Sequence, residues 1–134
     1  MAKSYSGQIA SLLDGREFDE SGADNDGSYT SVTVSGLSDL QTGSDWIDVT
    51  GRIRASIQAV ANSESQDVRV RGKVSFGAEP ETVNEATGIA TGAANATDIL
   101  AGRDVEKYAY LQIECRDNDQ SAGDGTVDIH GNLL

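Results

Sequence analysis

The stretch DWIDVTGRIRASIQAVANSESQDVRVRGKVSF, residues 45–76, decides the fold class of this chain. Apolar and polar side chains alternate on both sides of the polar segment 62–65. Because successive side chains of a β-strand point to opposite faces, this period of two predicts two antiparallel strands with one buried and one solvated face. The side chains predicted to point inward are Ile53, Ala55, Ile57, Ala59, Val68, Val70, Val74 and Phe76.

Similar runs occupy residues 29–35, 108–115 and 126–131, and loops rich in Gly, Asp, Asn and Ser join them. Residues 77–103 are the least regular part, with a turn at Pro80. The pattern contains no long helical period. Short alternating strands joined by such loops predict an all-β fold, an antiparallel β-sandwich or jelly-roll-like domain. The inward-facing residues of these runs are expected to be Val32, Val34, Ala109, Leu111, Ile113, Cys115, Val127 and Ile129.

The N-terminal part differs from the rest. We expect residues 1–28 to form an arm and a polar loop, the loop covering residues 19–28, and residues 29–134 to form the sandwich domain. Three apolar side chains at spacing i, i+3, i+4 allow one or two helical turns, too few to be stable alone. The alternative is an extended arm that becomes ordered only on a partner. The three residues are Ile9, Leu12 and Leu13.

The charge composition disfavours two classes of binding partner. The chain of 134 residues carries 22 acidic and 10 basic side chains, a net charge of −12. A nucleic acid is a disfavoured partner, since phosphate binding needs a basic surface, and an anionic membrane is disfavoured for the same reason. We find neither a run of about 20 apolar residues, as a membrane-spanning helix needs, nor the apolar centre of a secretory signal. These features predict a protein made in the cytoplasm that stays there or leaves within an assembly.

The hydrophobic fraction is 37% and the aromatic fraction only 5%. Such a chain can build one modest core, and a thin core is often supplemented by oligomerisation or by attachment to a larger body. Few aromatic platforms also weigh against a glycoside hydrolase, although the many carboxylates would offer pairs.

The acidic residues, the single histidine and the single cysteine form no recognisable catalytic or metal-binding motif in the sequence. Asp24-Asn25-Asp26-Gly27 and the group Asp117, Asp119 and Asp124 are similar to calcium loops. The first has Gly22 and Thr33 where the EF-hand pattern needs acidic residues, so solvated turns are the favoured interpretation for both. The single histidine, His130, is expected on the surface and has no further His or Cys with which to hold zinc. The single cysteine, Cys115, is expected to be a small buried hydrophobe. We therefore expect no enzyme activity, no metal and no cofactor.

Arg69, Arg71 and Lys73 form a short basic stripe on the outward face of the strand that begins near Val68. Pairing with acids across the sheet, such as Glu114 or Asp128, is the favoured interpretation. The alternative is a docking patch for an acidic partner. Gly72 falls on the inward face, where a bulge or a close backbone contact is expected.

Four segments together resemble small β-sandwich structural proteins of tailed viruses. They are DWIDVTG at residues 45–51, VRVRG at 68–72, KYAYLQI at 107–113 and GTVDIHG at 125–131. The resemblance spans residues 45–132 and leaves the N-terminal part uncovered.

The resemblance implies a virion protein, a capsid decoration (cement) protein that binds the outer shell and stabilises the head. It implies the major capsid protein as partner, a trimer as the oligomer, and synthesis in the host cytoplasm. Another virion part (head fibre, neck or tail protein) and a calcium- or carbohydrate-binding β-module are the alternatives. Contacts with the capsid or between subunits are expected from Ile9, Leu12 and Leu13, with Trp46 anchoring the core or a subunit interface.

Overall fold

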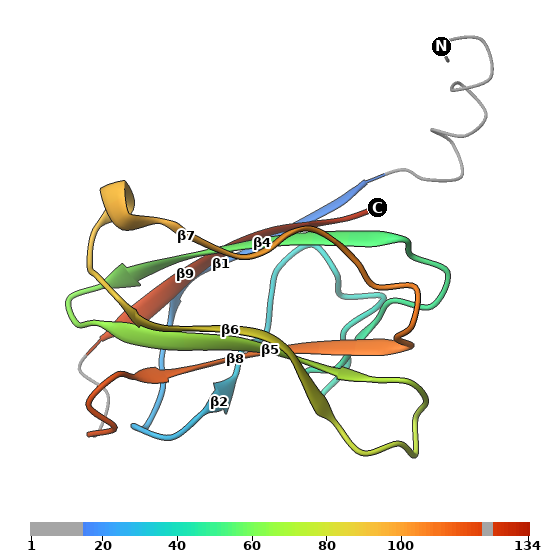
Figure 1. The fold of residues 1–134 in the computed structure, drawn as a ribbon, viewed down its shortest axis with the longest axis horizontal. Helices are drawn as coiled ribbons and strands as arrows, with labels where there is room; N and C mark the ends of the chain where they lie inside the picture. The colour runs from blue at the N-terminus through green and yellow to red at the C-terminus, as the bar shows by residue number, and fades with distance from the viewer. Residues whose placement is uncertain (1–14, 122–124) are drawn as a thin grey trace, which may run out of the picture.

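Two antiparallel β-sheets stacked face to face form the two layers of the molecule (Figure 1). The computed structural model describes residues 15–121 and 125–134. Within them lie the strands β1 (Arg16–Ala23), β2 (Thr30–Ser31), β3 (Ile47–Asp48), β4 (Arg54–Asn62), β5 (Gln66–Lys73), β6 (Glu81–Ile89), β7 (Thr97–Asp104), β8 (Tyr110–Asp117) and β9 (Thr126–Leu133), and the short 3-10 helix η1 (Ala93–Asn95).

One sheet has the strand order β1-β9-β4-β7 and the other the order β2-β8-β5-β6. Strand β3 pairs with β8 on the same side as β2, with Ile47 opposite Leu111. A hydrogen bond of 2.8 Å from Asn84 Nδ2 of β6 to the carbonyl of Ile99 in β7 links the two sheets along one side. The prediction of an all-β antiparallel sandwich is therefore confirmed.

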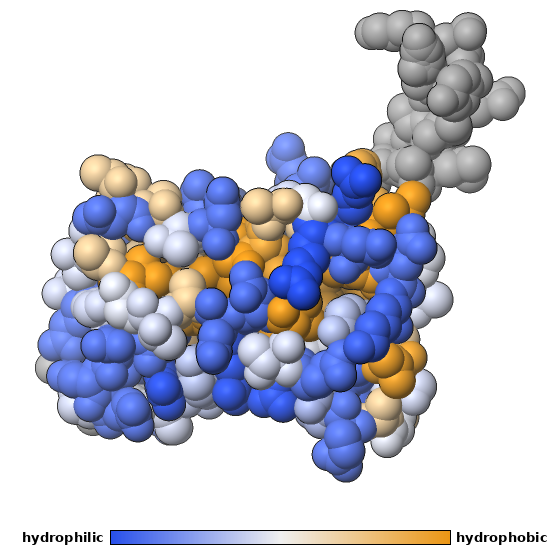
Figure 2. Space-filling view, viewed as in Figure 1, coloured by the Kyte–Doolittle hydropathy of each residue, from blue (hydrophilic) through white to orange (hydrophobic). Residues whose placement is uncertain are grey.

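The core fills the space between the sheets. It is built from small and branched aliphatic side chains, which suits a chain with few aromatic residues. In Figure 2, hydrophilic side chains cover much of the visible surface, and hydrophobic residues appear in a band between the two layers. The inward positions confirmed as buried are Val32, Val34, Ala55, Ile57, Ala59, Val68, Val70, Leu111, Ile113, Cys115, Val127 and Ile129.

Two predicted core residues are exposed. Val74 is 51% exposed and Phe76 is 80% exposed, so their assignment to the inward face is wrong. The pairing of β5 with β8 ends at Lys73 opposite Tyr110, and the chain then turns toward β6. The alternation continues past the end of the strand, where no sheet remains to bury one face.

The polar loop predicted for residues 19–28 begins only after Ala23. Residues 16–23 form β1, which lies at the edge of its sheet and pairs with β9 from Arg16 opposite Leu133 to Ala23 opposite Val127. Phe18 is the buried residue of this strand. Backbone pairing therefore holds β1 in the sheet. Its side chains show no apolar alternation from which the strand could be predicted.

Strand β6 also lies where the sequence predicts an irregular segment. Its buried positions are Val83 and Ile89, while Glu85 and Thr87, which a period of two would also turn inward, are exposed, so the strand shows no regular alternation. Its backbone pairs with β5, with a register shift between Val70 and Arg71 of that strand.

The expected close contact at Gly72 is confirmed, since a Cβ there would meet the ring of Tyr108 at 2.6 Å. The predicted contact residues Ile9, Leu12 and Leu13 lie outside the described residues. Over residues 15–121 and 125–134, no helix has the length and apolar character needed to cross a membrane.

Candidate functional site

The outer face of the sheet that contains β5 and β8 gathers basic and aromatic side chains. On β5, Arg69, Arg71 and Lys73 alternate with the buried residues Val68 and Val70, so they point away from the core. On β8, the same alternation turns Tyr110, Gln112, Glu114 and Arg116 outward.

The basic stripe makes cross-strand ion pairs. Arg69 stands opposite Glu114 in the register of β5 and β8, and its Nε lies 2.8 Å from Glu114 Oε1. Arg71 Nη1 lies 3.9 Å from the same oxygen. The pairing with Glu114 is thus as expected. A docking role for the stripe stays a prediction.

Tyr29 lies between two arginines on this face. The guanidinium carbons of Arg69 and Arg116 are 3.9 and 4.3 Å from the centre of its ring. Its buried hydroxyl makes no hydrogen bond within the described residues, and burial raises the pKa of the phenol. The stack holds both arginines in place, since a guanidinium plane packs favourably on an aromatic face.

Asp67 anchors the second of these arginines. Arg116 Nε donates to Asp67 Oδ2 at 2.9 Å, and the other carboxylate oxygen accepts from Asn118 Nδ2 at 2.8 Å and the Gly88 amide at 2.9 Å. Burial opposes the ionised form of Asp67, but the hydrogen bonds from Asn118, Gly88 and Arg116 outweigh it and lower the pKa of the carboxyl. The carboxylate therefore stays charged and orients Arg116.

A cavity of about 250 Å³ opens at the end of the face near Lys73. Lys73 Nζ lies 5.0 Å from the ring centre of Trp46 and 5.4 Å from that of Phe76. The rings of Phe76 and Tyr110 meet edge to face with centres 6.3 Å apart. The remaining lining residues are Asp39, Leu40, Thr42, Ser44 and Asp48.

Trp46 thus lies at the rim of a surface cavity. It is half-buried and is not part of the hydrophobic core cluster, so it does not anchor the core. Its predicted role at a subunit interface is compatible with this position and stays a prediction.

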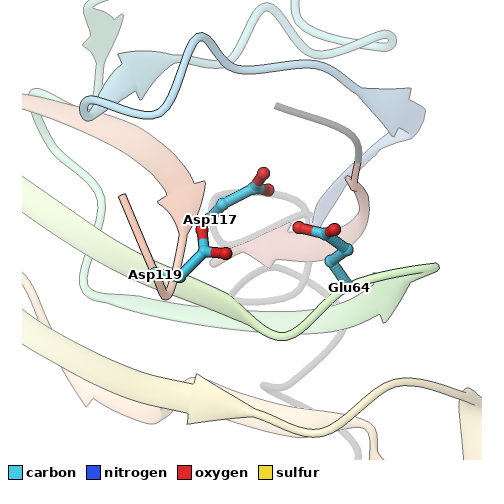
Figure 3. Close-up of side chains that lie close together, drawn as sticks. All are labelled: Glu64, Asp117 and Asp119. Atoms are coloured by element: carbon cyan, nitrogen blue, oxygen red, sulfur yellow. The ribbon is translucent and has the colours of Figure 1, made fainter. Parts of the chain in front are cut away.

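A second group, at another place in the fold, consists of three carboxylates. Glu64 comes from the turn between β4 and β5, Asp117 ends β8, and Asp119 follows it; one oxygen of each lies within 4.8 Å of the others. Figure 3 shows the three side chains close together. Converging carboxylate oxygens are the ligands that Ca²⁺ prefers. The predicted grouping of Asp117 with Asp119 is therefore correct, while Asp124 lies outside the described residues.

Hydrogen bonds already hold part of this acidic cluster. The buried Asp117 accepts from Gln66 Nε2 and, at 3.4 Å, from Asn25 Nδ2. The backbone amide and hydroxyl of Ser121 donate to Asp119 and lower the pKa of its carboxyl. Asn25 also accepts from the Gly27 amide at 3.0 Å, as in the predicted turn at residues 24–27.

Cys115 and His130 stand where the sequence places them. Cys115 is fully buried, and burial raises the pKa of its thiol to about 12, which confirms it as a small core residue. His130 is exposed on β9 opposite Asp19 of β1.

Several residues of the outer face were not singled out from the sequence. The alternation of residues 110–117 already turns Tyr110 and Arg116 to the face of the basic stripe, so this signal could have found them. Tyr29 and Phe76 belong to loops, and no local pattern reports that they lie beside β5.

Comparisons with known proteins give structural likeness alone. No family model matches the sequence, and no curated protein matches it. The structure of infectious bursal disease virus, Gx strain, aligns with a TM-score of 0.44 and 15% identity over 91% of this chain and 29% of that one. The VP2 subviral particle of infectious bursal disease virus aligns with a TM-score of 0.37 and 16% identity over 90% of this chain and 32% of that one. The chain spans less than a third of the length of either protein.

Proposed function

We propose that the chain is a non-enzymatic structural protein of a virion, a capsid decoration protein that binds the outer shell and stabilises the head. The observation that carries the proposal is the gathering of arginine and aromatic side chains on the outer face of the β5–β8 sheet. The segments that resemble structural proteins of tailed viruses, residues 45–51, 68–72 and 107–113, contribute to this same sheet.

The composition of this face differs from that of the whole chain. The chain has 10 basic and 22 acidic residues, yet four of the basic ones stand on this one face. Four of its seven aromatic residues lie on the face or at its end: Tyr29, Trp46, Phe76 and Tyr110. Arginine, tyrosine and tryptophan dominate the binding energy of protein interfaces, so this is the surface best suited to hold a protein partner.

The partner in this proposal is the major capsid protein, contacted by several copies at once. A trimer suits three-fold positions of a shell. Each contact can then be modest, since tethered copies bind at a high effective concentration. An acidic surface elsewhere would keep particles apart in solution.

The N-terminal residues have a separate part in the proposal. Ile9, Leu12 and Leu13 would add an apolar contact to the shell, either as a short amphipathic helix in a groove or as an added strand. The contact would begin close to the sandwich, because the paired strand β1 begins at Arg16.

Co-sedimentation with empty shells assembled from the major capsid protein encoded in the same genome tests the proposal. We expect saturable binding by the unaltered chain and at least roughly tenfold weaker binding by Lys73→Glu, because charge reversal at an interface opposes docking. Arg103→Glu is the matched control, since it changes an exposed cation on β7, in the other sheet. Failure of the unaltered chain to sediment with shells, or equal loss in both variants, would contradict the proposed role of this face.

A further inference from the structure

The cavity beside Lys73 has the lining of a sugar site. Three of the seven aromatic residues of the chain, Trp46, Phe76 and Tyr110, meet around it. Carboxylates, hydroxyls and one ammonium complete the wall. We propose that this cavity binds one neutral pyranose ring of a glycan.

The aromatic part of the lining suits the apolar faces of a pyranose. The C–H groups of a sugar ring gather on its two faces and pack on aromatic rings, while its hydroxyls point outward around the edge. Phe76 is 80% exposed on the loop between β5 and β6, so its ring is open to such packing. Trp46 is half-buried beside it, which holds the second ring in a defined place.

The polar part suits the hydroxyls. Asp48 Oδ1 accepts the backbone amide of Thr50 at 2.9 Å, which orients the carboxylate, and no described residue donates to its Oδ2. Arg16 holds both oxygens of Asp39, at 3.1 and 2.6 Å. Hydrogen bonds to charged groups are the stronger ones, so an oriented carboxylate and an ammonium at the rim can fix the orientation of a sugar.

Charge favours an uncharged ligand. A cation that sought the aromatic rings would meet the ammonium of Lys73, which already lies over Trp46 and Phe76 and forms no ion pair with any described residue. An anion would meet Asp39 and Asp48 in a protein whose net charge is −12. The volume, about 250 Å³, lies below the roughly 300 to 1,000 Å³ of pockets for larger ligands, which suits a single ring.

This inference does not rest on the proposed role on a capsid, although Trp46, Lys73, Phe76 and Tyr110 also belong to the face proposed to dock there. Binding of a pyranose does not require shells, and docking on shells does not require a sugar. The two proposals can therefore fail separately.

Titration followed by tryptophan fluorescence tests the site, because Trp46 is the single tryptophan of the chain. The probes are the methyl glycosides of glucose, galactose and mannose, with glucuronate as the charged comparison. We expect the fluorescence to change saturably with at least one glycoside, with a Kd of about 1 mM. Glucuronate should bind more weakly. Saturation-transfer NMR with the same sugars covers the case in which binding leaves the fluorescence unchanged.

Two variants complete the test. Phe76→Ala is expected to weaken glycoside binding by roughly threefold to tenfold, since it removes a packing face. Val74→Ala is the matched control, an exposed apolar residue of the same loop that does not line the cavity, and it should bind as the unaltered chain does. No response by either method, tighter binding of glucuronate, or equal loss in both variants would overturn the proposal. Loss of shell binding by Phe76→Ala without any sugar response would assign the cavity to protein docking and would likewise overturn it.

Discussion

The ring of Phe18 occupies the place that a side chain at position 131 would need. Phe18 of β1 stands opposite Gly131 of β9, and a Cβ built on Gly131 would collide with its ring. An aromatic ring that covers a glycine of the neighbouring strand fixes the register of the two. The contact explains how an edge strand with a single buried side chain stays in place.

Gly131→Ala should therefore destabilise the protein. The added methyl group forces the ring of Phe18 or the backbone of β1 to move, at a cost of about 1 to 3 kcal/mol. Urea unfolding followed by circular dichroism measures the change. Gly43→Ala is the control, because a Cβ at Gly43 meets nothing within 4 Å. An unchanged midpoint for Gly131→Ala would show that β1 gives way freely and does not depend on this contact.

The ion pair of Asp67 predicts a loss of stability in acid. Its carboxyl pKa is lowered in the folded protein, so its contribution is fully present above the unfolded pKa of about 4 and is lost as the pH falls through the folded value. Asp67→Asn should cost about 1 to 3 kcal/mol at neutral pH, because Arg116 loses its charged partner, and less at about pH 3.

Urea unfolding of the unaltered chain and of Asp67→Asn at the two pH values gives the comparison. Asp24→Asn serves as control, since Asp24 is exposed and makes no hydrogen bond among the described residues. A difference between the unaltered chain and Asp67→Asn that does not shrink in acid would contradict the assignment.

Cys115 should resist thiol reagents in the folded protein. Its side chain is fully buried and its pKa stands at about 12, so both access and the thiolate fraction are low. We expect Ellman's reagent at about pH 8 to react more than roughly 100-fold slower than with the protein in urea, where one thiol per chain should appear. Rapid reaction of the native protein would mean that β8 opens easily.

Calcium should leave the thermal stability unchanged. In the acidic cluster, Gln66 and Asn25 hold Asp117, and Ser121 holds Asp119. We therefore expect calcium at about 1 mM to shift the Tm by less than about 1 °C. A ligand that binds the folded protein and is in large excess over its Kd would raise the Tm by several degrees. Differential scanning calorimetry measures the Tm of the unaltered chain and of Glu64→Gln, each with calcium and with chelator. A calcium-dependent rise that Glu64→Gln abolishes would establish a cation site.

Deleting residues 1–14 should separate folding from shell binding. All the described strands lie after this segment, so the truncated chain should keep its circular dichroism and its unfolding midpoint. We expect shell binding to weaken by at least roughly tenfold, because the apolar contact from Ile9, Leu12 and Leu13 is lost. The double change Leu12→Ser and Leu13→Ser should act in the same direction without shortening the chain. Undiminished co-sedimentation of the truncated chain would remove the arm from the proposal.

The period of two was a sound guide wherever one face of a strand lies against the core. In residues 54–62 and 110–117 the buried residues are the ones that the alternation indicates, because burial follows directly from the direction of each side chain. The same reasoning failed at Val74 and Phe76, since alternation does not mark where pairing ends. It also missed β1 and β6, which the neighbouring strands hold through their backbones.

The sequence by itself therefore determined the fold class, the inward faces of the central strands, the burial of Cys115 and the outward direction of the basic stripe. The tertiary structure alone decided most of the contacts between distant segments. It brings Trp46, Phe76 and Tyr110 from three separate segments to one cavity, places Tyr29 between two arginines, and sets Glu64 beside Asp117. The physical reason is that side-chain direction is a local property of the backbone, whereas contacts between distant segments depend on strand register and on the path of the loops, which the packing of the whole domain selects.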